Sequence, residues 1–126
     1  MQRALAVYNN SGGSLAKDKV VYSTGYRRPS QLNAVALASA AASSTATVIG
    51  VMLRAVLDNT VGQVVFAGDI TADTSGYSAV GSKVYLSDTP GEFQTTAGSF
   101  STVIGLVKVK AVAGTITILC QPVLSP

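Results

Sequence analysis

The sequence predicts an all-β protein, an antiparallel barrel or sandwich built from two similar β-units with few or no helices. Short runs rich in Val, Ile, Thr and Tyr alternate with clusters of Gly, Asn, Asp, Pro and Ser, a pattern typical of small β-domains. One late run alternates apolar and charged residues, as a strand with one wet face does. In addition, three short motifs occur twice in the same order, which indicates an internal repeat.

The expected strands follow from these runs. Asn9-Asn10-Ser11-Gly12-Gly13 cannot continue a strand, and Thr89-Pro90-Gly91-Glu92 places Pro and Gly where a type II turn requires them. The Ala-rich residues 32–47 lack a charged helix face, which favours a short strand and a small-residue loop over a helix. The strands are expected at residues 5–8, 20–23, 34–37, 48–57, 62–67, 84–86, 102–112 and 115–121.

The last two strands are expected to form an antiparallel hairpin. Val107 and Val109 alternate with Lys108 and Lys110, which predicts one buried and one exposed face. Ala113-Gly114 is a tight connection between the two runs. Proline cannot donate a hydrogen bond to a sheet, so Pro122 and Pro126 are expected to end the pairing.

The repeat divides the expected domain into units at about residues 15–70 and 80–122. Gly50 and Gly105 interrupt apolar runs, where glycine is unfavourable unless a bulge, a bend or a close backbone approach requires it. We expect them to bend the long strands around the barrel. Tyr22 and Tyr85 are expected to bury their rings with the hydroxyl at the rim. The first unit contains Lys19-Val20-Val21-Tyr22-Ser23, Thr47-Val48-Ile49-Gly50-Val51 and Gly62-Gln63-Val64-Val65; the second contains Lys83-Val84-Tyr85-Leu86-Ser87, Thr102-Val103-Ile104-Gly105-Leu106 and Gly114-Thr115-Ile116-Thr117-Ile118.

Length and composition are consistent with one domain, residues 15–126, preceded by a strand or arm over residues 1–14. Hydrophobic residues make up 48% of the chain but aromatic residues only 6%, so aliphatic side chains must fill the core. Charged residues make up 12%, against about 25% in an ordinary soluble domain. A surface so poor in charge either consists of small neutral residues or is partly buried against other chains; the second alternative is favoured, and we therefore expect a homo-oligomer.

Several partners and locations are not expected. The nine basic residues are scattered rather than gathered on one face, which argues against nucleic-acid binding. The uncharged residues 29–53 contain Asn and many Ser and Thr, which argues against a membrane span. Cys120 is the only cysteine, so it cannot form an intrachain disulfide and is expected to be a small buried hydrophobe.

The sequence also argues against catalysis. Histidine is absent, which excludes Ser-His and Cys-His nucleophile arrangements, and no phosphate loop or zinc spacing is present. We expect no catalytic residue, cofactor or metal ligand, and the acidic residues are expected to cap turns. One alternative stays open, in which Asp69 and Asp73 share a cation or act as a glycosidase pair.

Two strings carry a resemblance to a known class. They are Gly62-Gln63-Val64-Val65-Phe66-Ala67-Gly68-Asp69-Ile70, followed by Asp73-Thr74-Ser75, and Gly81-Ser82-Lys83-Val84-Tyr85-Leu86-Ser87-Asp88-Thr89-Pro90-Gly91. Together with Val103-Ile104-Gly105-Leu106 they resemble small β-structured virion proteins of tailed bacteriophages, namely capsid decoration (cement) proteins and the β-modules of tail fibres. The resemblance covers about residues 15–121 and rests on the order of strands and turns.

The resemblance implies a trimer on the capsid surface of the virion, made in the host cytoplasm, that bridges subunits of the major capsid protein. A short chain starting at Met1 favours a decoration protein over the alternative, a tail-fibre or tail-spike module that binds a host receptor or glycan. The expected partner contacts are an N-terminal segment that adds a strand to a capsid edge and the basic pair that follows the second strand. These residues are Met1, Gln2, Arg3, Ala4, Leu5, Arg27 and Arg28.

Overall fold

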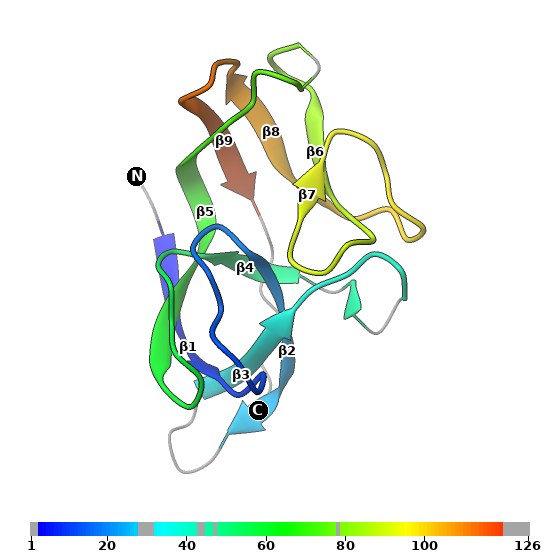
Figure 1. The fold of residues 1–126 in the computed structure, drawn as a ribbon. Coiled ribbons are helices and arrows are strands. Elements are labelled where there is room, and N and C mark those ends of the chain that lie inside the picture. Colours follow the sequence, from blue (N-terminus) through cyan, green and yellow to red (C-terminus); the bar gives the residue numbers. More distant parts are fainter. Residues whose placement is uncertain (1–2, 28–31, 43–44, 47, 78, 120–126) are drawn as a thin grey trace.

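The computed structural model describes residues 3–27, 32–42, 45–46, 48–77 and 79–119. These residues form β-strands and loops without an α-helix, and the predicted fold class is confirmed (Figure 1). The strands are β1 (Arg3–Asn9), β2 (Val20–Arg27), β3 (Leu32–Leu37), β4 (Val48–Met52), β5 (Val61–Ala72), β6 (Lys83–Leu86), β7 (Phe93–Gln94), β8 (Val103–Val109) and β9 (Gly114–Leu119).

The first five strands close into a barrel. Their order is β1-β3-β2-β4-β5, and β1 closes the ring by pairing with β5 as well as with β3. The β1–β3 pair is parallel, whereas β1 runs antiparallel to β5. The N-terminal segment expected as a separate strand or arm is therefore, from Arg3 to Asn9, part of the barrel wall.

The long strand β5 belongs to both halves of the molecule. Its first part, from Val61 to Ala67, pairs with β1, and its last part, from Ala67 to Ala72, pairs with β9. Beyond β9 the sheet continues through β8 and β6 to β7. Figure 1 shows β5 rising from the barrel into this second sheet, so one strand joins the two units covalently and through hydrogen bonds.

Two cores result from this arrangement. The barrel interior is filled by aliphatic side chains that include Val21, Ile49 and Val64. The second core lies between the outside of the barrel and the inner face of the second sheet, and includes Val20, Val51 and Ile104. Alternate residues of β2, β4 and β5 therefore point into different cores.

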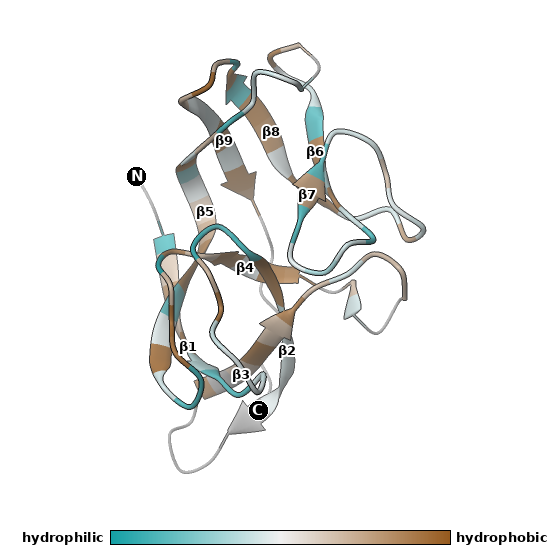
Figure 2. Ribbon diagram, in the orientation of Figure 1, coloured by the Kyte–Doolittle hydropathy of each residue, from teal (hydrophilic) through white to brown (hydrophobic). Residues whose placement is uncertain are grey.

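Strand β4 is buried on both faces. Val48 and Val51 pack in the core between the units, whereas Ile49 and Met52 pack inside the barrel. A strand covered on both sides has no polar face, which explains its continuous apolar sequence. Figure 2 shows this hydrophobic strand where the barrel meets the second sheet.

The strand trio β2-β4-β5 and the trio β6-β8-β9 have the same register. Both β2–β4 and β6–β8 contain an irregularity, after Val21 in one and after Val84 in the other. Each pair of the first trio has an equivalent in the second. The equivalents, first trio before second, are Val20↔Val51 with Lys83↔Leu106; Val21↔Gly50 with Val84↔Gly105; Tyr22↔Val48 with Tyr85↔Val103; Val51↔Val65 with Leu106↔Thr117; and Met52↔Val64 with Val107↔Ile116.

The turns that precede β2 and β6 correspond as well. The backbone N–H of Asp18 donates to the carbonyl of Met52 at 2.9 Å, and that of Gly81 donates to the carbonyl of Val107 at 2.8 Å. Asp18 and Gly81 both have positive φ. That two copies of one unit arose by duplication stays a prediction, but the strand registers and turn hydrogen bonds match it position by position.

The surroundings of Gly50 and Gly105 explain why both apolar runs contain a glycine. A Cβ at Gly50 would lie 2.7 Å from the carbonyl oxygen of Val65, and a Cβ at Gly105 would lie against that of Thr117. Such distances exclude any larger side chain unless the neighbouring backbone moves. Of the three reasons that the sequence allows for these glycines, a close backbone approach is present at both positions.

Several local predictions can be compared with the structure. The 32–47 segment begins with strand β3, as favoured over a helix, and β8 and β9 form the expected antiparallel pair. In the predicted type II turn, Gly91 has φ 80° and the N–H of Glu92 donates to Thr89 at 3.2 Å. Cys120, Pro122 and Pro126 lie outside the described residues.

The predicted strand over residues 48–57 is too long. It ends at Met52 because the chain turns away and Val56 returns to form an isolated bridge with Leu15, both side chains being buried in the barrel core. The two-residue strand β7 was not expected, because Phe93-Gln94 has no run of β-formers around it.

Candidate interaction surface

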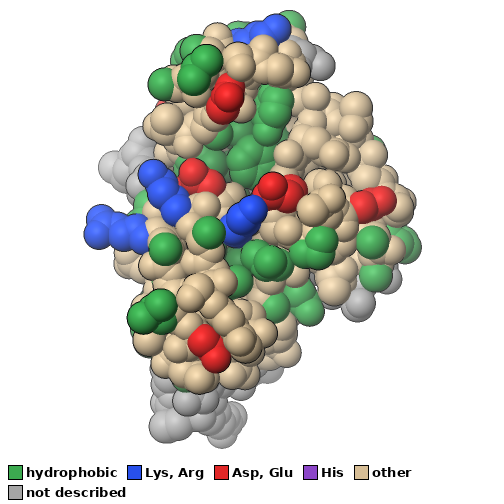
Figure 3. All heavy atoms as spheres, in the orientation of Figure 1, with side chains coloured by type: hydrophobic (Ala, Val, Ile, Leu, Met, Phe, Trp, Pro, Cys, Tyr) green, Lys and Arg blue, Asp and Glu red, His purple; other side chains and the backbone are tan. Residues whose placement is uncertain are grey.

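Among the described residues, two ion pairs join segments that lie far apart in the sequence. The Nζ of Lys19 lies 2.6 Å from Oε2 of Glu92, which links the first unit to the loop that leads into β7. The Nζ of Lys108 lies 2.6 Å from Oδ2 of Asp69, and Thr117 Oγ1 donates to Oδ1 of the same carboxylate at 2.8 Å. On the face seen in Figure 3, most charged side chains lie near the level where the two units meet, while much of the remaining surface is uncharged.

The predicted role of acidic residues in turns is confirmed at three of them. Asp58 accepts a hydrogen bond from the Gly12 N–H, Asp73 from the N–H and hydroxyl of Ser75, and Asp88 from those of Ser99. These hydrogen bonds from Ser75 and Ser99 lower the pKa of the Asp73 and Asp88 carboxyls. Asp73 and Asp88 are therefore ionised near neutral pH and hold their loops as carboxylates.

The positions of Asp69 and Asp73 do not support the alternative in which the two carboxyls act as a pair. Asp69 lies within β5 and Asp73 just after it, about 13 Å away along an extended chain of four residues. A glycosidase pair requires a separation of about 5–9.5 Å and one carboxyl with a raised pKa. Hydrogen bonds, above all the one from Lys108, lower the pKa of Asp69, so the two groups share the same ionised state.

A polar cleft lies beside the C-terminal part of β5. It encloses about 310 Å³ and brings cations from Lys17 and Arg54 near the carboxylates of Asp18 and Asp69. Partial burial raises the pKa of Asp18, while the nearby Lys17 opposes that rise. Within the described ranges, no group of three acidic, His or Cys residues is placed to hold a metal ion.

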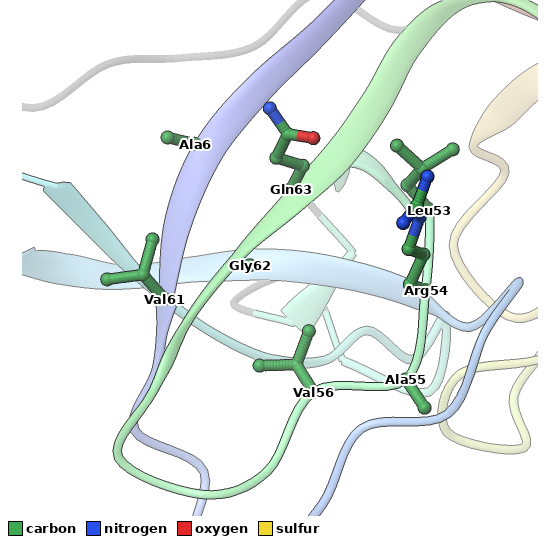
Figure 4. Close-up of a pocket in the computed structure, with 8 residues that line it drawn as sticks. All are labelled: Ala6, Leu53, Arg54, Ala55, Val56, Val61, Gly62 and Gln63. Atoms are coloured by element: carbon green, nitrogen blue, oxygen red, sulfur yellow. The ribbon is translucent and has the colours of Figure 1, made fainter.

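A second groove of about 470 Å³ lies beside the first part of β5 (Figure 4). It is bounded by Ala6 of β1, Gln63 of β5 and the loop from Leu53 to Val56. Val56 fills the space opposite Gly62, where a Cβ would collide with the valine methyl groups. The lining is mostly aliphatic, with the amide of Gln63 and the guanidinium of Arg54 as the polar groups.

The exposed apolar residues are concentrated on the second unit. Five of the nine large hydrophobic residues exposed in the described part of the chain lie between residues 103 and 119. Val103 and Leu106 of β8 are each 45% exposed, and Leu119 of β9 is 71% exposed. They alternate with the buried residues Ile104, Val107 and Ile118, so they belong to the outer face of the second sheet.

The predicted contact residues do not form one site in the structure. Arg3, Ala4 and Leu5 lie in strand β1 and pair with Ala67, Val65 and Val64 of β5, respectively. Arg27 ends β2, where its backbone pairs with Leu32. Met1, Gln2 and Arg28 lie outside the described residues. The sequence did not single out the outer face of the second unit as a contact surface. The alternation of Val107 with Lys108 did mark β8 as a strand with one exposed face.

No protein-family model matches the sequence, and no curated protein is similar to it at a significant level. The fold is similar to that of the N base of head fiber gp8.5 of bacteriophage phi29, with a TM-score of 0.57. The match covers 92% of this chain and 94% of the phage protein at 14% sequence identity, so it shows a shared fold.

In the part of the chain that the structure describes, no helix has the length and apolar character needed to cross a lipid bilayer.

Proposed function

We propose that this chain is a structural protein of a bacteriophage head that decorates the capsid and stabilises it by bridging subunits of the major capsid protein. One observation carries the proposal: nearly the whole chain shares its fold with the base of a phage head fiber. In the proposed role the molecule acts through surface complementarity, without a reaction step.

The architecture fits a clamp. A closed barrel and a second sheet share the continuous strand β5, and their common core contains residues from both units. Because the units are joined through that core, a load on one unit is transmitted to the other through packed side chains. Such a rigid body holds two neighbouring shell subunits at a fixed spacing.

Capsid binding tests the proposal directly. Purified chain is mixed with expanded capsids of the phage that encodes it, assembled without this protein, and bound chain is measured after sedimentation. We expect saturable binding and a higher temperature of capsid disruption. The proposal is lost if the chain stays in the supernatant, or if saturated capsids open at the same temperature as bare ones.

The contact residues offered for this role are tested separately. Arg3 is exposed at the start of β1, and we propose that it contacts the capsid. Arg3→Glu is expected to lower capsid occupancy at least tenfold, whereas Lys110→Glu, the same charge change at an exposed loop residue outside both clefts, is the matched control. Equal losses for the two variants would count against a contact at Arg3.

A fibre module is the second candidate, because the similar phage protein is the base of a fibre. Under this alternative the chain binds a receptor or glycan at a tail tip. Immunolabelling of intact virions separates the candidates, since label on the head supports decoration and label at the tail end supports the fibre module.

A further inference from the structure

Only the first of the two units is a closed barrel. Its ring is closed by the parallel pairing of β1 with β3. In the second unit, the last part of β5 pairs with β9 as β1 pairs with β5, and β7 pairs with β6 as β3 pairs with β2. Within the described residues, β7 and the last part of β5 are not paired with each other, so the second unit is open on that side.

The outer face of the first unit fills this opening. Val48 and Val51 lie on the outer face of the barrel strand β4, and they share one core with Ile104 and Ile116 from the inside of the second unit. The exposed fractions of Val48 and Val51 are 7% and 0%. The chain thus shows in its own fold what covers the outer face of such a unit, namely the aliphatic interior of an open β-unit.

The equivalent outer face of the second unit, formed by β6, β8 and β9, has no such cover among the described residues. Val103 and Leu106 of β8 are the equivalents of Val48 and Val51, yet each is 45% exposed. Leu119 of β9 is 71% exposed and extends the apolar area. Contiguous apolar surface on a sheet is typical of an interface with another protein.

This exposed face differs from its covered counterpart in the residues around the apolar centre. Lys83 and Thr117 occupy the positions that Val20 and Val65 occupy in the first unit. An apolar centre with polar surroundings is the composition of an interface between two proteins that fold separately, whereas the permanently covered face is apolar at all four positions. The face is therefore suited to a partner that binds after this chain has folded.

The charges beside the apolar centre are basic overall. Lys83 is exposed, and no ion pair in the described part of the chain includes it. Lys108 is paired with Asp69, so these two side chains together contribute no net charge. A protein surface complementary to this face therefore has an aliphatic centre with carboxylates beside it.

The face also continues to the residue proposed as a capsid contact. Leu119 pairs with Ala67 of β5, and Ala67 pairs in turn with Arg3 of β1. Neighbouring strands lie about 4.8 Å apart, so the backbones of Leu119 and Arg3 lie within about 10 Å of each other. Arg3 is exposed, and it adds a second basic group at the edge of the same surface.

We infer that the outer face of β6, β8 and β9 docks on the capsid, against an aliphatic β-sheet of a shell subunit that is bordered by carboxylates. The inference rests on the proposed function and assigns a contact surface to it. A second copy of this chain does not offer such a sheet, because its first unit is a closed barrel and its open unit is already filled by its own β4. The partner is therefore a different protein.

Sedimentation with capsids tests the apolar centre. Leu106→Asp is expected to raise the concentration of chain needed for half-saturation at least tenfold, because it places a carboxylate in the centre of the contact. Leu57→Asp, the same change at a 69% exposed loop residue of the first unit, is expected to bind as the native chain does. If Leu106→Asp also binds as the native chain does, the inference is overturned and the proposed function stands. If the native chain itself does not bind, both are overturned.

The basic edge is tested by a charge reversal. Lys83→Glu is expected to weaken capsid binding at least fivefold, whereas Lys110→Glu, the same change at an exposed residue beyond the end of β8, is the matched control. Native binding is expected to weaken as salt is added, because salt screens the attraction between exposed charges. A Lys83→Glu variant that binds no more weakly than Lys110→Glu overturns the assignment of carboxylates to the partner.

A labelling footprint tests the contact without weakening it. In a Cys120→Ser background, Val103→Cys and, as the control, Leu57→Cys are treated with a maleimide in the free chain and on saturated capsids. Capsid binding is expected to slow the labelling of Val103→Cys at least tenfold and to leave that of Leu57→Cys unchanged. Equal labelling rates of Val103→Cys in the two states overturn the inference. So does a folded Leu106→Asp variant with a smaller mass in solution than the native chain, since the face would then join copies of this chain.

Discussion

Gly50 and Gly105 occupy equivalent positions in the two units, each opposite the strand irregularity and against a carbonyl oxygen of the next strand. The neighbouring carbonyls belong to Val65 and Thr117, which are themselves equivalent. The same backbone contact is therefore made twice in one chain. It allows three adjacent strands to curve closely enough to enclose a core.

Alanine at either glycine should destabilise the fold, because the added methyl group meets backbone atoms that cannot move aside alone. We expect Gly50→Ala and Gly105→Ala each to lower the free energy of unfolding by about 1–3 kcal/mol. Chemical denaturation measures the change. Gly76→Ala is the control, because its Cβ would have no neighbour within 4 Å and a change within about 0.5 kcal/mol is expected.

Buried polar side chains at Asn9 and Thr74 hold corresponding loops. Nδ2 of Asn9 donates to the Val56 and Gly13 carbonyls at 3.0 and 2.9 Å, and the Thr74 hydroxyl donates to Val109 at 2.7 Å and accepts from the Ala111 N–H at 3.0 Å. Removing one partner leaves a buried group unpaired, so Asn9→Leu and Thr74→Val should each cost about 1–3 kcal/mol in unfolding free energy. Ser101→Ala, at an exposed position outside both hydrogen-bond networks, should cost much less; equal losses would contradict this account.

The turns before β2 and β6 offer a reciprocal test of backbone strain. Asp18 has φ 67° and its counterpart Gly81 has φ 90°. Asp18→Gly removes the steric cost of a left-handed residue but adds chain entropy, for a net gain of about 0.5–1 kcal/mol in unfolding free energy. Gly81→Ala should lose about 1 kcal/mol, because no neighbour within 4 Å complicates the substitution. Thermal and urea unfolding of both variants measure whether the free energy of unfolding rises for Asp18→Gly and falls for Gly81→Ala.

Acid should destabilise the protein through the carboxylates that hold turns and ion pairs. The lowered pKa values of Asp69, Asp73 and Asp88 mean that the stabilisation from each is present above its unfolded pKa and is lost as pH falls through its folded pKa. The melting temperature should therefore decrease as the pH is lowered below about 4. Asp88→Asn should reduce this dependence, and an unchanged acid profile would contradict the assignment.

The Asp18 carboxyl should change the stability of the fold with pH in the opposite direction. Its raised pKa favours the folded state at pH values below the unfolded pKa, and this contribution is lost as pH rises through the folded pKa. Asp18→Asn removes that contribution, so the variant should lose stability more steeply than the native chain between pH 5 and pH 3. Melting temperatures measured across about that range of pH test the sign.

Local sequence features determined much of the fold. Alternation of apolar and polar residues placed most strands, the order Pro90-Gly91 placed a turn, and glycine within apolar runs located two close backbone contacts. These predictions succeed because each depends on the conformational limits of one residue and its immediate neighbours. The three repeated motifs likewise lie in strands with matching registers.

The tertiary structure decided how those elements are used. Nothing local to Arg3–Asn9 distinguishes a free arm from the strand that closes a barrel, because the difference lies in its distant partners β3 and β5. The same holds for the two equivalent outer faces: Val51 and Leu106 are both apolar and occupy the same register position, yet one is buried and the other exposed. Sequence pattern sets which side chains share a face of a strand, whereas only the packing of the two units determines which face is covered.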